Sequence, residues 1–245
     1  MTNTEAWDRC AAAYQAAIDL PLDVAHYGPD VPDESELHLI GDVAEKRVLE
    51  LGCGAGQASI AFAGQGAHAI AVDTSRAQLA HGRALAAKAE ARVEWHECDL
   101  ADLAFLRADS IDLAFSAYAL GEVEDLDRVF RQVHRVLRPA GAFVFSYEHP
   151  FSMCLGREPA AAGPGALALG RLEVTSSYFE TGPVTIERHG ERFEIWPRTI
   201  ADVFAALGRA GFKVEVIAEP PPVRTSDPGP AVPSTIIWRT RKEGV

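Results

Sequence analysis

The stretch "VLELGCGAGQ", residues 48–57, places Gly52, Gly54 and Gly56 between an apolar run and the apolar residues 58–63. The first run indicates a β-strand and the second a helix. Glycine has no Cβ, so the chain can bend sharply here and a ligand can approach the main chain closely. A helix that begins at such a turn also attracts a negatively charged group to its amino end. The stretch therefore predicts a strand–turn–helix ligand site, with an unrelated structural turn as the alternative.

The same alternation of strand and helix continues along the chain. Apolar runs predict strands at 47–52, 68–74, 92–99, 110–119 and 141–149. Helical spacing and end signals predict helices at 57–65, 75–89 and 125–137. Strands joined by helices of this length pair in parallel through right-handed crossovers, with helices on both faces of one sheet. The sequence thus predicts an α/β protein with a doubly wound sheet.

The last part of the chain, 199–245, extends this sheet. A helix is predicted at 199–211, where Thr199 and Asp202 have the spacing of a capping box. Two further strands, 213–219 and 234–241, are separated by a proline-rich loop without a helix. Such strands are expected to be antiparallel neighbours, which predicts a sheet of about seven strands with the last one antiparallel.

Two segments lie outside this alternation. Residues 1–45 predict an N-terminal helix over 4–18 followed by loop, and we expect them to form a lid. Residues 151–198 interrupt the pattern with a low-complexity stretch and a hairpin at "RHGE", which predicts an inserted substrate flap. Between them, 46–150 would form a cofactor-binding core. All of 1–245 is expected to be a single domain.

Composition excludes several kinds of partner. The chain has 245 residues and a formal net charge of −12, so nucleic acid and anionic membranes should repel it. Its cysteines, Cys10, Cys53, Cys98 and Cys154, form no CxxC pair and have no histidine at zinc spacing, so no metal site is predicted. Reduced thiols, no leader segment and no apolar run of about 20 residues predict a cytoplasmic protein.

Two acidic residues follow strands at the same edge of the predicted sheet. Asp73 comes about 20 residues after the glycines, where a carboxylate can accept both hydroxyl hydrogens of a ribose. Its alternative role is to cap the next helix, although Thr74 and Ser75 are available for that. Asp99, with the backbone N–H of Leu100, could pair with an adenine edge; a solvated turn aspartate is the alternative. Together with the glycines, these acids favour a nucleotide-like ligand.

The spacing of the glycines separates two nucleotide sites. The dinucleotide fingerprint G-x-G-x-x-G requires a third glycine at position 57, where this chain has Gln57. An NAD(P)-dependent oxidoreductase remains an alternative, because Gly52, Gly54 and Asp73 would serve it as well. The missing third glycine and the lack of a Tyr-x-x-x-Lys pair disfavour it.

The motifs as a set resemble the class I S-adenosylmethionine-dependent methyltransferases, especially their small-molecule, type 11-like group. The resemblance rests on "VLELGCGAG", "AVDTS" with "AQLAHGR", "ECDL", "DSIDLAFSAYAL", "RVFRQVHRVLRPAGAFVFS" and "SYEHPF". It covers about residues 46–150 and is specific for fold and cofactor, but says little about the substrate. It implies a Rossmann-like fold and S-adenosyl-L-methionine as the cofactor.

The resemblance also implies roles for single residues. The backbone of Gly52, Cys53 and Gly54 would lie against the methionyl part of the cofactor, and Asp73 would hold the ribose. The other cofactor-binding residues implied are Thr74 and Gln78 beside the adenosine, Asp99 and Leu100 at the adenine, Ser116 and Ala117 on the methionine side, and Tyr14 in the lid. For Tyr14, ordinary core packing of the helix is the alternative.

The predicted activity is transfer of a methyl group to O, N or C of a small molecule. Because the cofactor's methyl group is already activated, the protein need only place the acceptor in line and exclude water. His149, after the fifth strand, is the candidate general base; a structural hydrogen bond before Pro150 is its alternative. The flap is rich in rings that suit a moderately sized apolar or aromatic acceptor, or a small core of their own: Phe151, Tyr178, Phe179, Phe193 and Trp196. A non-catalytic cofactor-binding protein is a further alternative, and no oligomeric state is predicted.

Overall fold

A computed structural model describes residues 2–18, 20–29, 31–157, 172–221, 223 and 232–244. The helices are α1 (Asn3–Ala17), α2 (Glu34–Leu37), α3 (Gln57–Gly64), α4 (Arg76–Lys88), α5 (Leu126–Val136) and α6 (Ile200–Arg209), with the 3-10 turns η1 (Leu120–Glu122) and η2 (Ser152–Cys154). The strands are β1 (Arg47–Leu51), β2 (His68–Asp73), β3 (Val93–Glu97), β4 (Ile111–Ala117), β5 (Leu137–Glu148), β6 (Leu155–Arg157), β7 (Leu172–Val174), β8 (Val184–Arg188), β9 (Glu191–Ile195), β10 (Phe212–Ala218) and β11 (Thr235–Lys242).

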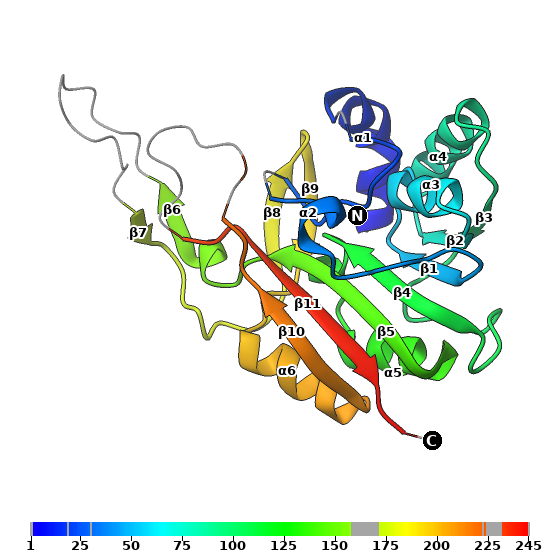
Figure 1. The fold of residues 1–245 in the computed structure, drawn as a ribbon. Coiled ribbons are helices and arrows are strands. Elements are labelled where there is room, and N and C mark those ends of the chain that lie inside the picture. Colours follow the sequence, from blue (N-terminus) through cyan, green and yellow to red (C-terminus); the bar gives the residue numbers. More distant parts are fainter. Residues whose placement is uncertain are drawn as a thin grey trace.

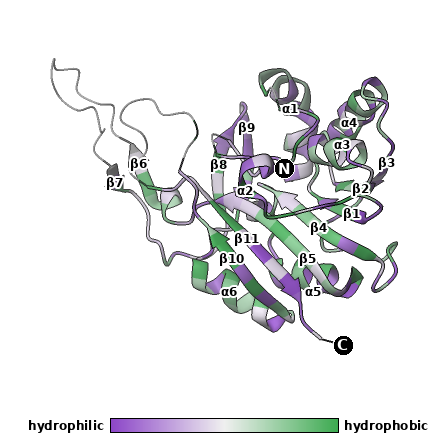
Figure 2. Cartoon of the chain, viewed as in Figure 1, coloured by the Kyte–Doolittle hydropathy of each residue, from purple (hydrophilic) through white to green (hydrophobic). Residues whose placement is uncertain are grey.

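Seven of the strands form one twisted sheet in the order β10-β11-β5-β4-β1-β2-β3 (Figure 1). β1 to β5 pair in parallel, whereas β11 runs antiparallel to both of its neighbours, β5 and β10. The prediction of a doubly wound α/β sheet with an antiparallel last strand is confirmed. Both faces are covered, and apolar residues run along the central strands β4 and β5 (Figure 2).

The two faces of the sheet have different covers. On one face, α5 and α6 bury residues such as Phe130, Val133 and Leu207 against β5 and β11. On the other face, α3 contributes Phe62, and the segment 25–43 contributes Tyr27 and its neighbours. Tyr27 is fully buried. Residues 25–43, expected to be part of a lid, are therefore in good part a layer of the core.

The junction between α5 and β5 differs from the prediction. We expected the helix to end at 137 and the strand to begin at 141, but α5 ends at Val136 and β5 begins at Leu137. Leu137 pairs with Ile111 and Ala142 with Leu113, so three more residues lie between the pairs on β5 than on β4. Ala140, in this bulge, has a φ of +62°. The proline and glycine signals thus mark an irregularity inside the strand rather than a loop before it.

Within the flap region, the described residues form two small sheets apart from the main one. β6 pairs with β7, and β8 pairs with β9 in the hairpin predicted at "RHGE". The hairpin turn uses His189 and Gly190, both with positive φ. β9 packs against α1, so the flap hairpin and the N-terminal helix meet above the sheet (Figure 1). The low-complexity stretch of the flap lies outside the described residues.

Candidate active site

The sheet reverses its strand order at β1, which pairs with β2 on one side and with β4 on the other. An open α/β sheet binds its ligand beyond the carboxyl ends of the strands at such a point. The turn after β1 carries Gly52, Gly54 and Gly56, whose φ angles are +65°, +53° and +66°. A residue with a Cβ is strained in this left-handed region. The turn therefore requires its glycines.

Each of these glycines has a different neighbour. A Cβ on Gly52 would lie 2.1 Å from the Cβ of Ala119, and one on Gly56 would lie 2.5 Å from the ring of Trp95. These two glycines let the turn pack against the loop after β4 and against β3. A Cβ on Gly54 would meet nothing nearer than Oε1 of Gln78, 3.9 Å away. The main chain at Gly54 is thus open to a ligand.

Asp73 ends β2 beside this turn. Its Oδ2 accepts the N–H of Gly54 and its Oδ1 accepts the N–H of Ser75, both at 2.8 Å. Burial raises the pKa of the Asp73 carboxyl, and hydrogen bonds from the backbone oppose that shift. A carboxylate has about four acceptor sites, so Asp73 can still accept the two hydroxyl hydrogens of a ribose. Ser75, not Asp73, is the N-cap of α4. The turn and the acid fit an adenosyl cofactor.

Glu50 holds the amino end of α3 from the inside. It is buried, and its Oε2 accepts the N–H and the Oγ–H of Ser59 at 2.8 and 2.5 Å. Burial raises the pKa of the Glu50 carboxyl to about 7. An acid is favoured at the amino end of a helix, so the chain itself supplies part of the negative charge that we expected from a ligand. The signal in the sequence is a glutamate within an apolar strand.

Thr74 and Gln78 both contact α1. Oγ1 of Thr4 lies 3.0 Å from Oγ1 of Thr74. Gln15 donates from Nε2 to Oε1 of Gln78 at 2.8 Å and accepts from Nε2 of Gln57 at 2.8 Å. Hydrogen bonds from Thr4 and Gln15 therefore hold α1 over the glycine turn. The sequence did not single out these two residues.

Asp99 and Leu100 are neighbours in the sequence but have different surroundings in the structure. Asp99 is exposed, and its Oδ1 accepts the N–H of Ala101 at 2.7 Å. Leu100 is buried, and its Cδ1 would lie 3.6 Å from a Cβ on Gly52. Leu100 is thus beside the glycine turn, whereas the contact of Asp99 is the one expected of a turn aspartate.

Ser116 and Ala117 end β4, the strand that pairs with β1 on the side away from β2. Ser116 is buried, and within the described part of the chain its Oγ has no hydrogen-bond partner. Tyr118, which follows Ala117, has a φ of +58°. Its ring occupies the space that Gly28 leaves by lacking a Cβ. Such strain is found where surrounding contacts hold a functional turn in place. Here it turns the chain out of the sheet and brings Ala119 against Gly52.

Cys53 and Tyr14 complete the predicted set. Cys53 is buried, and burial raises the pKa of its thiol well above the ordinary value, so it is a packing residue rather than a reactive one. The Tyr14 ring lies 5.2 Å from that of Trp7 and 4.8 Å from that of His189, centroid to centroid. Tyr14 therefore sits between α1 and the hairpin turn of the flap.

His149 is buried and has both ring nitrogens occupied. Its Nε2 lies 2.8 Å from Oε1 of Glu219, and its Nδ1 accepts the N–H of Phe151 at 3.2 Å. It is not among the residues that line the pocket beside the crevice. This arrangement favours the structural alternative over the role of general base.

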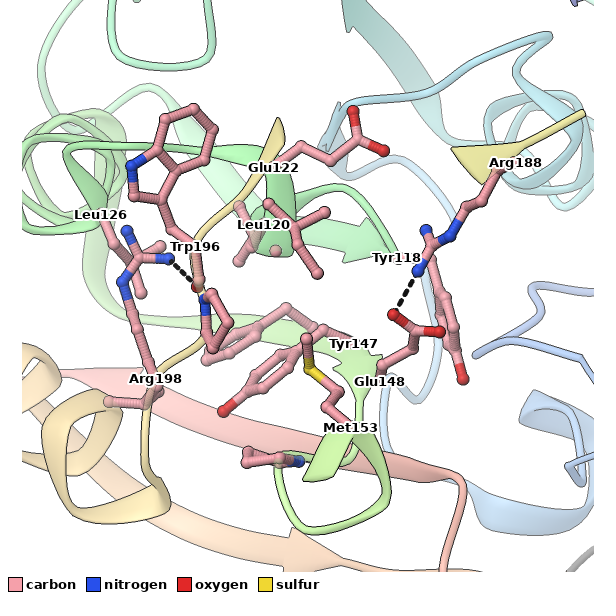
Figure 3. Close-up of a pocket in the computed structure, with 16 residues that line it drawn as sticks. Tyr118, Leu120, Glu122, Leu126, Tyr147, Glu148, Met153, Arg188, Trp196 and Arg198 are labelled. Carbon is pink, nitrogen blue, oxygen red and sulfur yellow. Dashed lines mark hydrogen bonds and ion pairs between the residues drawn. The ribbon is translucent and has the colours of Figure 1, made fainter. Parts of the chain in front are cut away.

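That pocket lies beneath the flap hairpin, at the carboxyl ends of β4 and β5 (Figure 3). Its walls are mostly apolar and aromatic, and include Leu120, Leu126, Phe145, Tyr147, Met153 and Trp196. We call it the acceptor pocket. Of the flap rings expected to bind an acceptor, only Trp196 lines it. Phe193 is buried against α1, and Phe151 and Phe179 are exposed.

Four charged side chains also line the acceptor pocket, and both arginines are engaged. Arg188 forms an ion pair with Glu148 (Figure 3). Arg198 donates to the backbone carbonyls of Val123, Glu124 and Trp196 at 2.5, 2.7 and 3.0 Å. The fourth, Glu122, accepts Nε1–H of Trp7 at 2.9 Å. Neither Glu122 nor the α1 residues that contact it were predicted, because the contacts join distant parts of the chain.

Comparison with known proteins shows similarity to methyltransferases. Residues 48–141 match the family model of a methyltransferase domain. A demethylmenaquinone methyltransferase from Clavibacter sepedonicus is 36% identical over 43% of this chain and 42% of its own length. The chain spans about half the length, or less, of this enzyme and of the ubiquinone and malonyl-acyl-carrier-protein O-methyltransferases that it also matches.

Solved structures extend the similarity over most of the chain. An S-adenosylmethionine-dependent methyltransferase from Mesorhizobium loti is 29% identical, with a TM-score of 0.67 over 84% of this chain and 94% of its own. A protein from Listeria monocytogenes, 24% identical, shares the fold with a TM-score of 0.69 over 86% of this chain and 98% of its own. Residues 48–141 therefore match a methyltransferase domain, and most of the chain shares its fold with S-adenosylmethionine-dependent methyltransferases. The predictions of class and of cofactor are confirmed, and the match favours this class over NAD(P)-dependent oxidoreductases.

The described residues contain neither a membrane-spanning helix nor a cluster of metal-binding side chains. No helix there is long and apolar enough to cross a membrane. In the same part of the chain, no group of three or more His, Cys, Asp or Glu side chains could hold a metal ion.

Proposed function

We propose that this chain transfers a methyl group from S-adenosyl-L-methionine to O, N or C of a small molecule. The observation that carries the proposal is the open main chain at Gly54, flanked by Asp73 at the reversal point of the sheet. The pocket beside it is walled by apolar and aromatic side chains, as small-molecule sites are. Relatives that act on small molecules, such as the demethylmenaquinone enzyme, support the same class of acceptor.

The residues have separate tasks in this proposal. The Gly52–Gly54 backbone lies against the methionyl part of the cofactor, and Asp73 accepts the ribose hydroxyls. Leu100 lines the adenosine side, and α1 covers the crevice through Gln15 and Thr4. When bound, the cofactor supplies an activated methyl group on sulfur. The chain holds the acceptor in line with that methyl and excludes water, and such placement can contribute about 7–11 kcal/mol in favourable cases.

The remaining expectations are part of this proposal. Within 1–45 the helix α1 would act as the lid, since 25–43 is mostly a core layer, and 151–198 and 199–245 would act as substrate flap and sheet extension. The net charge of −12 supports a small-molecule partner rather than nucleic acid. The cytoplasmic location stays a prediction, consistent with four free cysteines.

Calorimetric titration with S-adenosylhomocysteine tests cofactor binding. The wild-type chain should bind it, and Asp73→Asn should weaken binding at least tenfold because the amide cannot accept both ribose hydroxyls. Asp102→Asn, an equivalent change in the neighbouring exposed turn, is the control. Binding of NAD in preference to S-adenosylhomocysteine would contradict the proposal. Transfer of labelled methyl to metabolite pools then separates an enzyme from a non-catalytic cofactor-binding protein.

A further inference from the structure

Glu122 lies where the cofactor turn meets the acceptor pocket. It is on η1, three residues after Ala119, and Ala119 packs against Gly52. It also lines the acceptor pocket, as do Tyr118 and Leu120 (Figure 3). Glu122 is therefore a carboxylate of the pocket wall that lies three residues from the contact with the glycine turn.

Donors from the N-terminal helix hold the Glu122 carboxylate in place. Nε1 of Trp7 donates to Oε2 at 2.9 Å and Nδ2 of Asn3 donates to the same oxygen at 3.4 Å. Both donors reach Oε2, so Oε1 is the oxygen available to an acceptor. α1 thus orients the carboxylate of Glu122.

The surroundings of Glu122 adjust its protonation. Burial is the main cause that raises the pKa of its carboxyl to about 7. Asp73 at the end of β2 and Glu148 on β5 raise it further, whereas Arg188 on β8 and the hydrogen bond from Trp7 lower it. On α1, Cys10 and Tyr14 also face this carboxyl. A carboxyl that exchanges its proton near neutral pH is suited to general base catalysis.

The rest of the acceptor pocket limits what can bind. Both arginines are engaged, Arg188 by Glu148 and Arg198 by three backbone carbonyls. With Glu122 and Glu148 also present, a carboxylate or phosphate acceptor would meet like charge without a free cation. The apolar walls instead match a neutral, largely apolar molecule.

We propose, building on the methyl transfer above, that Glu122 is the catalytic base for a neutral, largely apolar acceptor methylated at a hydroxyl oxygen or an amine nitrogen. The acceptor atom forms a bond to the methyl carbon as the carbon–sulfur bond breaks, and that bond's electron pair stays on sulfur. The proton of the acceptor atom passes to Oε1 of Glu122. One neutral thioether, one methylated product and one protonated Glu122 result, and solvent then removes the proton.

Proton release on cofactor binding tests the position of Glu122 without an acceptor. The sulfonium of S-adenosylmethionine carries a positive charge that the thioether of S-adenosylhomocysteine lacks. If that charge faces Glu122, it lowers the pKa of the carboxyl, so at pH 7 S-adenosylmethionine should release up to about half a proton more. Calorimetry in buffers of different ionisation enthalpy measures this difference. It should vanish in Glu122→Gln and persist in Glu124→Gln, the same change at an exposed residue two positions away.

Two results would distinguish a failure of the proposed function from a failure of the role of Glu122. If neither ligand binds the wild-type chain, the proposed function falls. If both bind but the wild type and Glu122→Gln release the same number of protons, the role of Glu122 falls while the proposed function survives.

A methyl-transfer screen of phenols, amines and carboxylic acids, with labelled cofactor between pH 6 and 9, tests the acceptor class. Methylation should occur on the phenols or amines, with kcat/KM for the acceptor rising with pH below about pH 7, because the bound sulfonium lowers the pKa of Glu122. Glu122→Gln should lower kcat roughly 100-fold or more and remove that rise, with an unchanged Kd for S-adenosylhomocysteine. Methyl esters of carboxylic acids as the main products, or an unchanged kcat, would overturn the inference.

Discussion

Gly56 and Gly54, two residues of the glycine turn, have different roles: Gly56 serves packing and Gly54 serves ligand binding. Gly56 lets the turn lie against the ring of Trp95, and the same ring also excludes a Cβ at Gly82. A Cβ on Gly54 would have only Oε1 of Gln78 within 4 Å, at 3.9 Å, so the main chain there is open. Both have positive φ, so they share the same backbone requirement and differ only in their surroundings.

Replacing each of these two glycines with alanine should therefore have different effects. Gly54→Ala should cost roughly 1–2 kcal/mol of unfolding free energy, the strain of alanine in this conformation. It should also weaken binding of S-adenosylhomocysteine, because the new methyl group projects into the ligand's space. Gly56→Ala should cost about 1–3 kcal/mol more, from overlap with Trp95. Urea unfolding and calorimetry measure both; equal stability of the two variants would refute the packing role of Gly56.

At the scale of elements, α1 and the flap hairpin act together as a cover for the crevice. Oδ1 of Asp8 accepts the Oγ–H of Ser75 at 2.6 Å and the N–H of Ala77 at 3.0 Å, so α1 is tied to the amino end of α4. On its other side, α1 buries Ala6 and Cys10 against Phe193 of β9. This small apolar cluster joins the hairpin to the helix.

Phe193→Ala should loosen that cover. Loss of a buried phenylalanine costs about 3–5 kcal/mol in a core, and here the loss falls on the contact between α1 and β9. We expect faster hydrogen exchange along α1 and faster release of S-adenosylhomocysteine, with little change in the central sheet. Phe179→Ala removes an 80% exposed ring from the same flap and serves as the control. If both variants exchange alike, the hairpin does not hold α1.

At the scale of the whole molecule, the C-terminal strands are joined to the core beside the acceptor pocket. The N–H of His149, just after β5, donates to the carbonyl of Ser234, which precedes β11, at 2.8 Å. Its ring contacts Glu219, which follows β10. One residue thus links the ends of three neighbouring strands.

His149→Ala should therefore lower stability and leave turnover nearly unchanged. The ring of His149 makes two hydrogen bonds, and each contributes about 0.5–1.5 kcal/mol, so the Tm should fall, with kcat within a factor of about two. His68→Ala, an exposed histidine on β2, should change neither. A fall in kcat of tenfold or more at unchanged Tm would restore the original hypothesis that His149 is the base.

Local patterns determined the architecture of this protein. Alternating apolar runs and helical spacing specified the sheet, because each pattern is read within about ten residues of chain. The glycine turn and Asp73 were also predictable, since parallel strands bring their carboxyl ends to one edge. The bulge at Ala140 was not, because it depends on the register between β4 and β5.

Only the tertiary structure decided which distant side chains meet. Glu122 contacts Trp7 across 115 positions of sequence, and His149 contacts Glu219 across 70. Tyr27, in a segment without regular periodicity, became a fully buried core residue. Hydrophobic period and turn chemistry describe neighbours along the chain, whereas burial, charge and proton affinity depend on neighbours in space. For that reason the sequence alone determined the fold and the cofactor, and folding decided the acceptor pocket and its acid.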